Sequence, residues 1–158
     1  MNIGQSSPTI GGFVARMGDF FDRIGQPRVA GRLFGHLLIC DPAEQSAAQL
    51  QQAIGASAGS VNTMLRRLQA AGLVERRGEV GGRRLWYKIA PGAFARALAA
   101  RVPLVTELKE LAEIGLEAIT PGGKRAQRLL EMRDCYAFFE EEFPAVVERY
   151  ESISGAPA

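Results

Sequence analysis

The strongest structural signals of the chain lie in residues 46–89, SAAQLQQAIGASAGSVNTMLRRLQAAGLVERRGEVGGRRLWYKI. Ser46 followed three residues later by Gln49 is the pattern of a capping box at the start of a helix. The apolar face that follows consists of Leu50, Ala53 and Ile54. Gly55 suits the left-handed position at a helix end. The pattern predicts a short amphipathic helix over residues 46–54.

A second helix is expected to begin after an N-cap at Ser57, to run to Ala71 and to be closed by Gly72. At 100° per residue, its buried face consists of Val61, Met64, Leu65 and Leu68. The outer side carries small, polar and basic residues, namely Gly59, Ser60, Asn62, Thr63, Arg66 and Arg67. The solvent-exposed side of an ordinary core helix normally includes glutamate, whereas this helix has no acidic residue. The pattern therefore favours a helix that lies in a DNA groove.

The last part of the stretch predicts a β-hairpin. Leu73 and Val74 begin one strand, residues 78–82 form a glycine-rich turn, and residues 84–89 alternate as a second strand. The basic side chains of this hairpin are Arg76, Arg77, Arg83, Arg84 and Lys88. A flexible arginine tip directly after a helix-turn-helix suits phosphate contact or insertion into the minor groove.

The positive charge of the chain is concentrated in this module. Residues 57–90 hold seven basic and two acidic side chains, whereas the whole chain has a net charge of +2. Residues 1–56 are balanced, and residues 91–158 carry eight basic and eleven acidic groups. Arginine and lysine contacts displace the counterions of DNA, so a basic module favours phosphate binding. The charge distribution alone fits a solvated surface as well as a phosphate-binding one. The helix and hairpin patterns favour phosphate binding.

Two helices are expected before the module. Residues 10–24 place apolar side chains at spacings of three and four, which predicts one buried face formed by Phe13, Met17, Phe20, Phe21 and Ile24. Pro27 can occupy the first turn of the next helix, whose apolar repeat stops at Asp41-Pro42.

The C-terminal third predicts a helical dimerisation region. A seam at spacings of three and four spans three heptads and consists of Leu129, Met132, Tyr136, Phe139, Phe143, Val146 and Tyr150. Such a seam needs a partner helix, and a helix between Pro103 and Thr120 can satisfy part of it within the subunit. Pro144 lacks a backbone N–H and is expected to kink or interrupt the last helix.

The remaining residues argue against an enzyme, a membrane protein and a metal site. Cys40 and Cys135 fit reduced thiols in a cytoplasmic protein, and the longest apolar run, residues 37–40, is too short to span a bilayer. His36 lies four residues before Cys40, but no second Cys/His pair accompanies them. With a single histidine, no nucleophile, base and orienting group can be assembled. We expect no cofactor.

Six aromatic residues are candidates for an effector pocket between the DNA module and the dimer layer: Phe20, Phe21, Phe34, Phe94, Tyr136 and Phe139. Ring faces of this kind favour a cationic ligand. Core packing is the simpler interpretation of the same residues. The sequence does not identify an effector.

The order of these elements resembles a known family. Residues 57–68 and 71–76, followed by a basic wing, are similar to the winged helix-turn-helix of MarR-type bacterial transcription regulators. Residues 26–35 and 41–50 resemble the GbsR branch, whose type member is a choline-responsive repressor. The wing departs from the pattern, because Gly82 precedes Arg83 where family members often carry an acidic residue.

The resemblance implies a mainly α fold with a small β-wing, in which a winged helix-turn-helix lies between dimerisation helices. The expected parts are an N-terminal helix of the dimerisation layer (residues 1–26), a DNA-binding domain (27–90) and a C-terminal dimerisation region (91–158). The interface of a homodimer would then include Phe13, Met17 and Phe20 besides the C-terminal seam. The expected DNA-contacting set is Ser57, Gly59, Ser60, Asn62, Thr63, Arg66, Arg67, Arg76, Arg77, Arg83, Arg84 and Lys88.

The function expected from this reading is that of a cytoplasmic, sequence-specific DNA-binding regulator. It is a ligand-responsive repressor that binds a near-palindromic operator as a homodimer. The alternative is a protein-interaction adaptor, in which the module docks a partner through Trp86 and the arginines without reading a DNA sequence.

Overall fold

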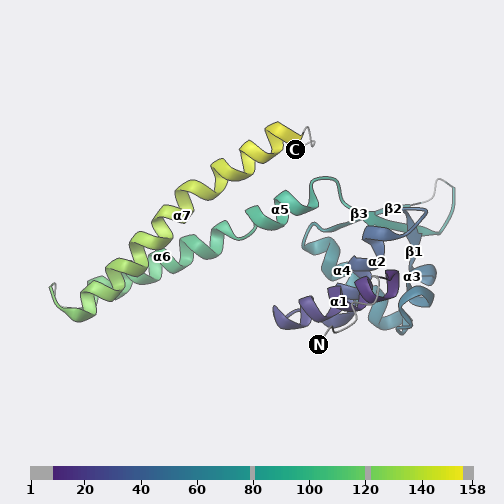
Figure 1. Cartoon of the computed structure of the whole chain (residues 1–158), viewed down its shortest axis with the longest axis horizontal. Helices are drawn as coiled ribbons and strands as arrows, with labels where there is room; N and C mark the ends of the chain where they lie inside the picture. Colours follow the sequence, from purple (N-terminus) through teal and green to yellow (C-terminus); the bar gives the residue numbers. More distant parts are fainter. Residues whose placement is uncertain (1–8, 79–80, 120–121, 155–158) are drawn as a thin grey trace, which may run out of the picture. The chain divides into compact units, whose positions relative to one another are not determined.

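A computed structural model describes residues 9–78, 81–119 and 122–154 and divides the chain into two compact units, the first ending at Ala93. The elements in chain order (Figure 1) are α1 (Ile10–Arg23), α2 (Arg28–Ile39), β1 (Gln45–Ser46), α3 (Ala47–Ile54), α4 (Ala58–Ala70), β2 (Val74–Gly78), β3 (Leu85–Ile89), α5 (Ala93–Ala99), α6 (Val102–Glu117) and α7 (Lys124–Ser154). The mainly helical fold with one small antiparallel sheet confirms the expected fold class.

The core of the first unit lies where α2, α3 and α4 pack together. Its most buried large side chains, each at most 2% exposed, are Leu33, Leu50, Ile54, Val61 and Leu65. Phe21 of α1, Val74 of β2 and Tyr87 of β3 belong to the same cluster. Burial of one such aliphatic side chain contributes about 1.5–3 kcal/mol, so the helix-turn-helix and the base of the hairpin are held as one body.

The helix ends confirm the capping signals in the sequence. Ser46 Oγ accepts the Gln49 N–H at 3.3 Å, and Gln49 Oε1 accepts the Ser46 N–H at 2.8 Å, which completes a capping box on α3. Ser57 Oγ accepts the Ser60 N–H at 3.2 Å and caps α4. Gly55 ends α3 with a φ of 63°, as a left-handed C-cap requires. These caps set the turn between α3 and α4.

Helix α1 buries only part of the apolar stripe that the sequence predicted, namely Phe21 and, partly, Met17. The residues it buries are Val14, Gly18 and Phe21. The residues of the predicted stripe that stay exposed are Phe13, Phe20 and Ile24. The stripe therefore merges two faces, and the expectation of one buried face is wrong for the single chain.

Glycines on α2 explain which face of α1 is buried. A Cβ added at Gly31 would lie 2.5 Å from the Met17 carbonyl oxygen, and one at Gly35 would lie 2.9 Å from Met17 Cβ. The backbones thus approach at a distance that no other residue type permits. The side of α1 that faces these glycines is therefore buried, and the apolar pattern of α1 does not determine which side this is.

The sheet has three strands in the order β1-β3-β2, where the sequence predicted a two-stranded hairpin. Strands β2 and β3 pair antiparallel from Val74 opposite Ile89 to Gly78 opposite Leu85. The added strand β1 places Gln45 opposite Tyr87. A two-residue strand shows no alternation, so no sequence pattern could reveal it. It connects the hairpin to the start of α3.

The second unit is built on a hairpin of α6 and α7, which lie side by side in Figure 1. Ala112 and Ala126 are buried in it, and a Cβ at Gly115 would lie 3.1 Å from the Leu129 methyl groups. Part of the predicted seam is thus satisfied within the subunit, as expected. In the described part of the chain, no helix is both long and apolar enough to cross a membrane.

The sequence predicts that Pro144 kinks or interrupts the last helix; α7 continues through it, so the interruption does not occur. A proline in a helix interior removes one backbone hydrogen bond and costs about 3 kcal/mol. In a helix of 31 residues the turns on both sides keep their own hydrogen bonds, and α6 packs along it. The long helix therefore tolerates the proline.

An ion pair ties α6 to α7 and gives this unit a pH dependence. Lys109 Nζ lies 2.5 Å from Glu140 Oε2. Hydrogen bonds from Lys109 and Thr106 hold the pKa of Glu140 below its ordinary value, while the bond to Glu140 raises the pKa of Lys109. A carboxyl with a lowered pKa in the folded state contributes stability above its ordinary pKa, and the contribution is lost as the pH falls through the lowered value.

We therefore expect Glu140→Gln to lower the melting temperature slightly at pH 7 and to have a progressively smaller effect as the pH is lowered toward 3. Thermal unfolding followed by circular dichroism across this pH range measures the difference. Glu141→Gln, an exposed neighbour on α7, is the control and should follow the wild type throughout. Identical curves for Glu140→Gln and the wild type at pH 7 would contradict the expectation.

Candidate nucleic-acid interface

Helix α4 presents the predicted outer face to solvent. Its buried side consists of Val61, Leu65 and Leu68. The outer residues Gly59, Asn62, Thr63, Arg66 and Arg67 are exposed, as is the N-cap Ser57, and Ser60 is half-buried. Within the described residues, neither arginine takes part in an ion pair. The buried side of α4 fixes the helix in the core, and the exposed side is free to contact a ligand.

Gly59 has no packing role within the subunit, because a Cβ there would meet nothing within 4 Å. Glycine in the first turn of a helix weakens that helix relative to alanine. Together with Ala58 it leaves the start of α4 with almost no side-chain bulk. Such a surface allows a DNA backbone to approach the helix closely.

The hairpin carries the other predicted cations. Arg76, Arg77, Arg83 and Arg84 are exposed, and Lys88 is half-buried. The Arg84 guanidinium lies 5.7 Å from the centre of the Trp86 ring, a distance at which a cation is attracted to the ring face. The predicted turn includes residues 79 and 80, which lie outside the described residues.

Two of these cations are already paired with carboxylates. Arg77 Nη2 donates to Glu44 Oε2 at 2.6 Å. Lys88 Nζ lies 3.7 Å from Glu44 and 3.1 Å from Glu75. A phosphate that binds Arg77 or Lys88 must therefore compete with Glu44. Glu44 could not be predicted from the sequence, because its role follows from the pairing of β1 with β3, more than 30 residues away.

Replacing Glu44 with glutamine is expected to raise the affinity for DNA roughly threefold, since exposed ion pairs contribute up to about 1 kcal/mol. The substitution releases Arg77 for phosphates, while Lys88 keeps its closer ion pair with Glu75. Fluorescence anisotropy with a labelled duplex measures the change. Glu75→Gln is the matched control, because it alters the net charge equally but leaves the Arg77–Glu44 ion pair intact. An equal gain from both variants would show a general charge effect and contradict a specific competition by Glu44.

Five of the ten predicted dimerisation residues are exposed. On α1, Phe13 and Phe20 are exposed, whereas Met17 packs against the core. On α7, the exposed seam residues are Phe139, Val146 and Tyr150. The half-buried ones are Leu129, Met132, Tyr136 and Phe143. The C-terminal half of the seam is therefore the more exposed half, and it is the part that most requires a partner helix.

The six aromatic candidates for an effector pocket divide between the two units. Phe21 and Phe34 are buried in the core of the first unit with ring centres 5.8 Å apart, so core packing explains both. Phe20 contacts Phe21 edge-on and is exposed. Phe94, Tyr136 and Phe139 belong to the second unit. A pocket shared by all six stays a prediction.

A helix-turn-helix with a basic, carboxylate-free outer helix and an adjoining basic hairpin defines the winged-helix class of DNA-binding regulators. Residues 27–85 match the model of the MarR family, and residues 92–152 match that of the MmpR5-like MarR family transcriptional regulators. The chain belongs to the MarR family of transcriptional regulators.

Two relatives cover almost the whole chain. The HTH-type transcriptional regulator MmpR5 of Mycobacterium tuberculosis is 38% identical over 151 residues, which cover 95% of this chain and 92% of that protein. A crystal structure described as a transcriptional regulator superimposes with a TM-score of 0.76 and is 39% identical, covering 92% of this chain and 99% of that one. Both similarities extend over the winged module and the C-terminal helices.

Proposed function

We propose that this DNA-binding regulator is a repressor that acts as a homodimer on a near-palindromic operator, with one α4 helix in each half-site. The observation that carries the proposal is the geometry of α4. Its apolar side is fixed in the core, and its exposed side offers two arginines with no neighbouring carboxylate on the helix. Such a helix can enter a major groove without reorganising the fold.

The exposed residues divide by the kind of DNA contact they can make. Thr63 and Arg66 lie on the middle of α4 and can reach base edges, so their substitution should alter base preference. Arg83 and Arg84 lie at the hairpin tip and can reach phosphates, so their loss should weaken binding to all sequences alike. If each subunit neutralises about four phosphates, the log–log dependence on salt has a slope near −7 for the dimer.

Exposed apolar side chains support a second copy as partner. Phe139, Val146 and Tyr150 are 43–55% exposed along one seam of α7. A seam of this kind normally packs against another helix. Dimerisation would place two recognition helices about 34 Å apart, the repeat of the DNA major groove.

The proposal also covers the cellular location of the protein, its branch within the family and its control by an effector. Reduced cysteines and a basic DNA-binding module suit the cytoplasm. The MmpR5 relative favours an MmpR5-like type, whereas the GbsR branch rests on sequence resemblance alone. Control by an effector remains part of the proposal. The adaptor alternative has no support in the comparisons.

Sedimentation of the full chain, alone and with a duplex, tests the dimer. The wild type should sediment as a dimer and bind one duplex with two chains. Phe139→Asp places a charge on the seam and should shift the protein toward the monomer and weaken DNA binding more than tenfold. Ser152→Asp, an exposed position on α7 away from the seam, should behave as the wild type. A wild type that binds DNA at full affinity as a monomer would contradict the proposal.

A further inference from the structure

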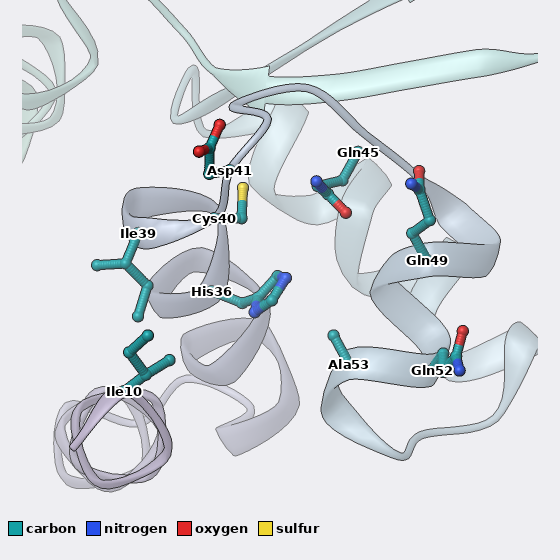
Figure 2. A pocket seen from close by; sticks show the side chains of 9 residues that line it. All are labelled: Ile10, His36, Ile39, Cys40, Asp41, Gln45, Gln49, Gln52 and Ala53. Carbon is teal, nitrogen blue, oxygen red and sulfur yellow. The ribbon is translucent and has the colours of Figure 1, made fainter.

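A cavity of about 520 Å³ opens in the first unit between the start of α1, the end of α2 and helix α3 (Figure 2). Pockets that bind small molecules in proteins span roughly 300–1,000 Å³. Residues that line this one include Ile10, His36, Ile39, Asp41, Gln45 and Ala53. None of them belongs to the DNA-contacting set, the dimerisation set or the aromatic set. The cavity is therefore unexplained by the functions discussed above.

Gln45 places a hydrogen-bond acceptor in this cavity. Its side chain belongs to a residue that is only 7% exposed, and its Nε2 donates to the Pro42 carbonyl at 2.7 Å. Its Oε1 accepts no hydrogen bond from the described part of the chain. Figure 2 shows the amide directed into the space between α2 and α3. This oxygen is therefore free to accept a hydrogen bond, and a molecule in the cavity can donate it.

His36 faces the same space from α2 (Figure 2). Its partial burial lowers the pKa of the imidazole. The ring is therefore neutral at pH 7 and carries one donor and one acceptor nitrogen. With Gln45 it forms a pair of uncharged polar groups that can recognise a hydroxyl or an N–H group.

The other lining residues determine which molecules fit. Ile10, Ile39 and Ala53 supply apolar surface, so the body of a ligand is apolar. The residues that line the cavity include neither lysine nor arginine among the described residues. A carboxylate ligand would find no compensating cation there. The surroundings favour an uncharged molecule.

We propose that this cavity is a binding site for a small uncharged molecule with an apolar body and one hydroxyl or N–H donor, which donates to Gln45 Oε1 beside His36. The site lies in the DNA-binding unit, and none of the aromatic residues predicted to bind an effector lines it. The proposal goes beyond the regulator function and is tested without DNA, so its outcome is independent of any operator.

The probe is 2-naphthol, which is uncharged at pH 7 and combines one hydroxyl donor with a bicyclic apolar body. Isothermal titration calorimetry with the full chain should show saturable binding of one molecule per chain. The matched probe 2-naphthoate has the same ring system and a carboxylate, and it should bind at least tenfold more weakly. Absence of saturable 2-naphthol binding, or equal binding of both probes, would overturn the proposal.

Two substitutions on α3 locate the site. Ala53→Phe fills the cavity and should weaken 2-naphthol binding at least tenfold. Ala48→Phe makes the same change at an exposed position of the helix outside the cavity and should leave binding unchanged. Thermal unfolding checks that both variants are folded, and His36→Leu, with the same expected loss, replaces Ala53→Phe if that variant does not fold. Wild-type affinity in the cavity variant would overturn the assignment.

Discussion

Replacing Arg66 and Arg67 together with alanine is expected to lower the affinity for the operator by at least about 100-fold. Each arginine contact to a base edge or phosphate contributes about 1–3 kcal/mol, and 1.4 kcal/mol corresponds to a factor of ten. Both side chains are exposed on α4, so the substitutions leave the buried side of the helix intact. Fluorescence anisotropy at fixed salt, with the DNA that flanks the protein's own gene, measures the loss.

The control removes the same charge elsewhere. Arg125→Ala combined with Arg128→Ala alters two exposed positions near the start of α7 and should change the affinity little. Equal, sequence-independent binding by the wild type and the α4 variant would contradict the regulator function. That result would restore the adaptor alternative.

Gly31→Ala is expected to destabilise the protein by about 3 kcal/mol, which is the upper range for overpacking a core. A Cβ at this position would lie 2.5 Å from the Met17 carbonyl oxygen and 2.7 Å from Phe21 Cβ. The carbonyl belongs to the backbone of α1, so the clash can be relieved only by separating the two helices. Chemical denaturation followed by circular dichroism, at one protein concentration, measures the change in the free energy of unfolding.

Gly11→Ala is the matched control for this substitution. Gly11 also lies in a helix, but a Cβ there would meet nothing within 4 Å. Alanine should therefore keep or slightly raise the stability, because glycine loses more conformational freedom on folding. A Gly31→Ala variant as stable as the wild type would contradict the close packing of α1 on α2.

The helix-turn-helix could be predicted from the sequence because its signals are local. The Ser46 capping box, the Gly55 C-cap and the apolar face of α4 each depend on residues within one or two helical turns. Helix geometry then determines which residues point outward, so the exposed face of α4 followed from the same pattern.

The features that could not be predicted depend on contacts between distant residues. Strand β1 is too short for a pattern and forms only by pairing with β3. The buried face of α1 is selected by Gly31 and Gly35 of the neighbouring helix. The pairing of Glu44 with Arg77 depends on that same sheet. Each of these contacts changes how a predicted residue acts without changing the fold class.

If each subunit reads one half-site through α4, DNase I footprinting of the wild type on the DNA that flanks its own gene should reveal it. We expect a discrete protected region with two related half-sites whose centres lie about 10 base pairs apart, or a multiple of that spacing. Uniform protection along the DNA, with no preferred site at any concentration, would contradict it.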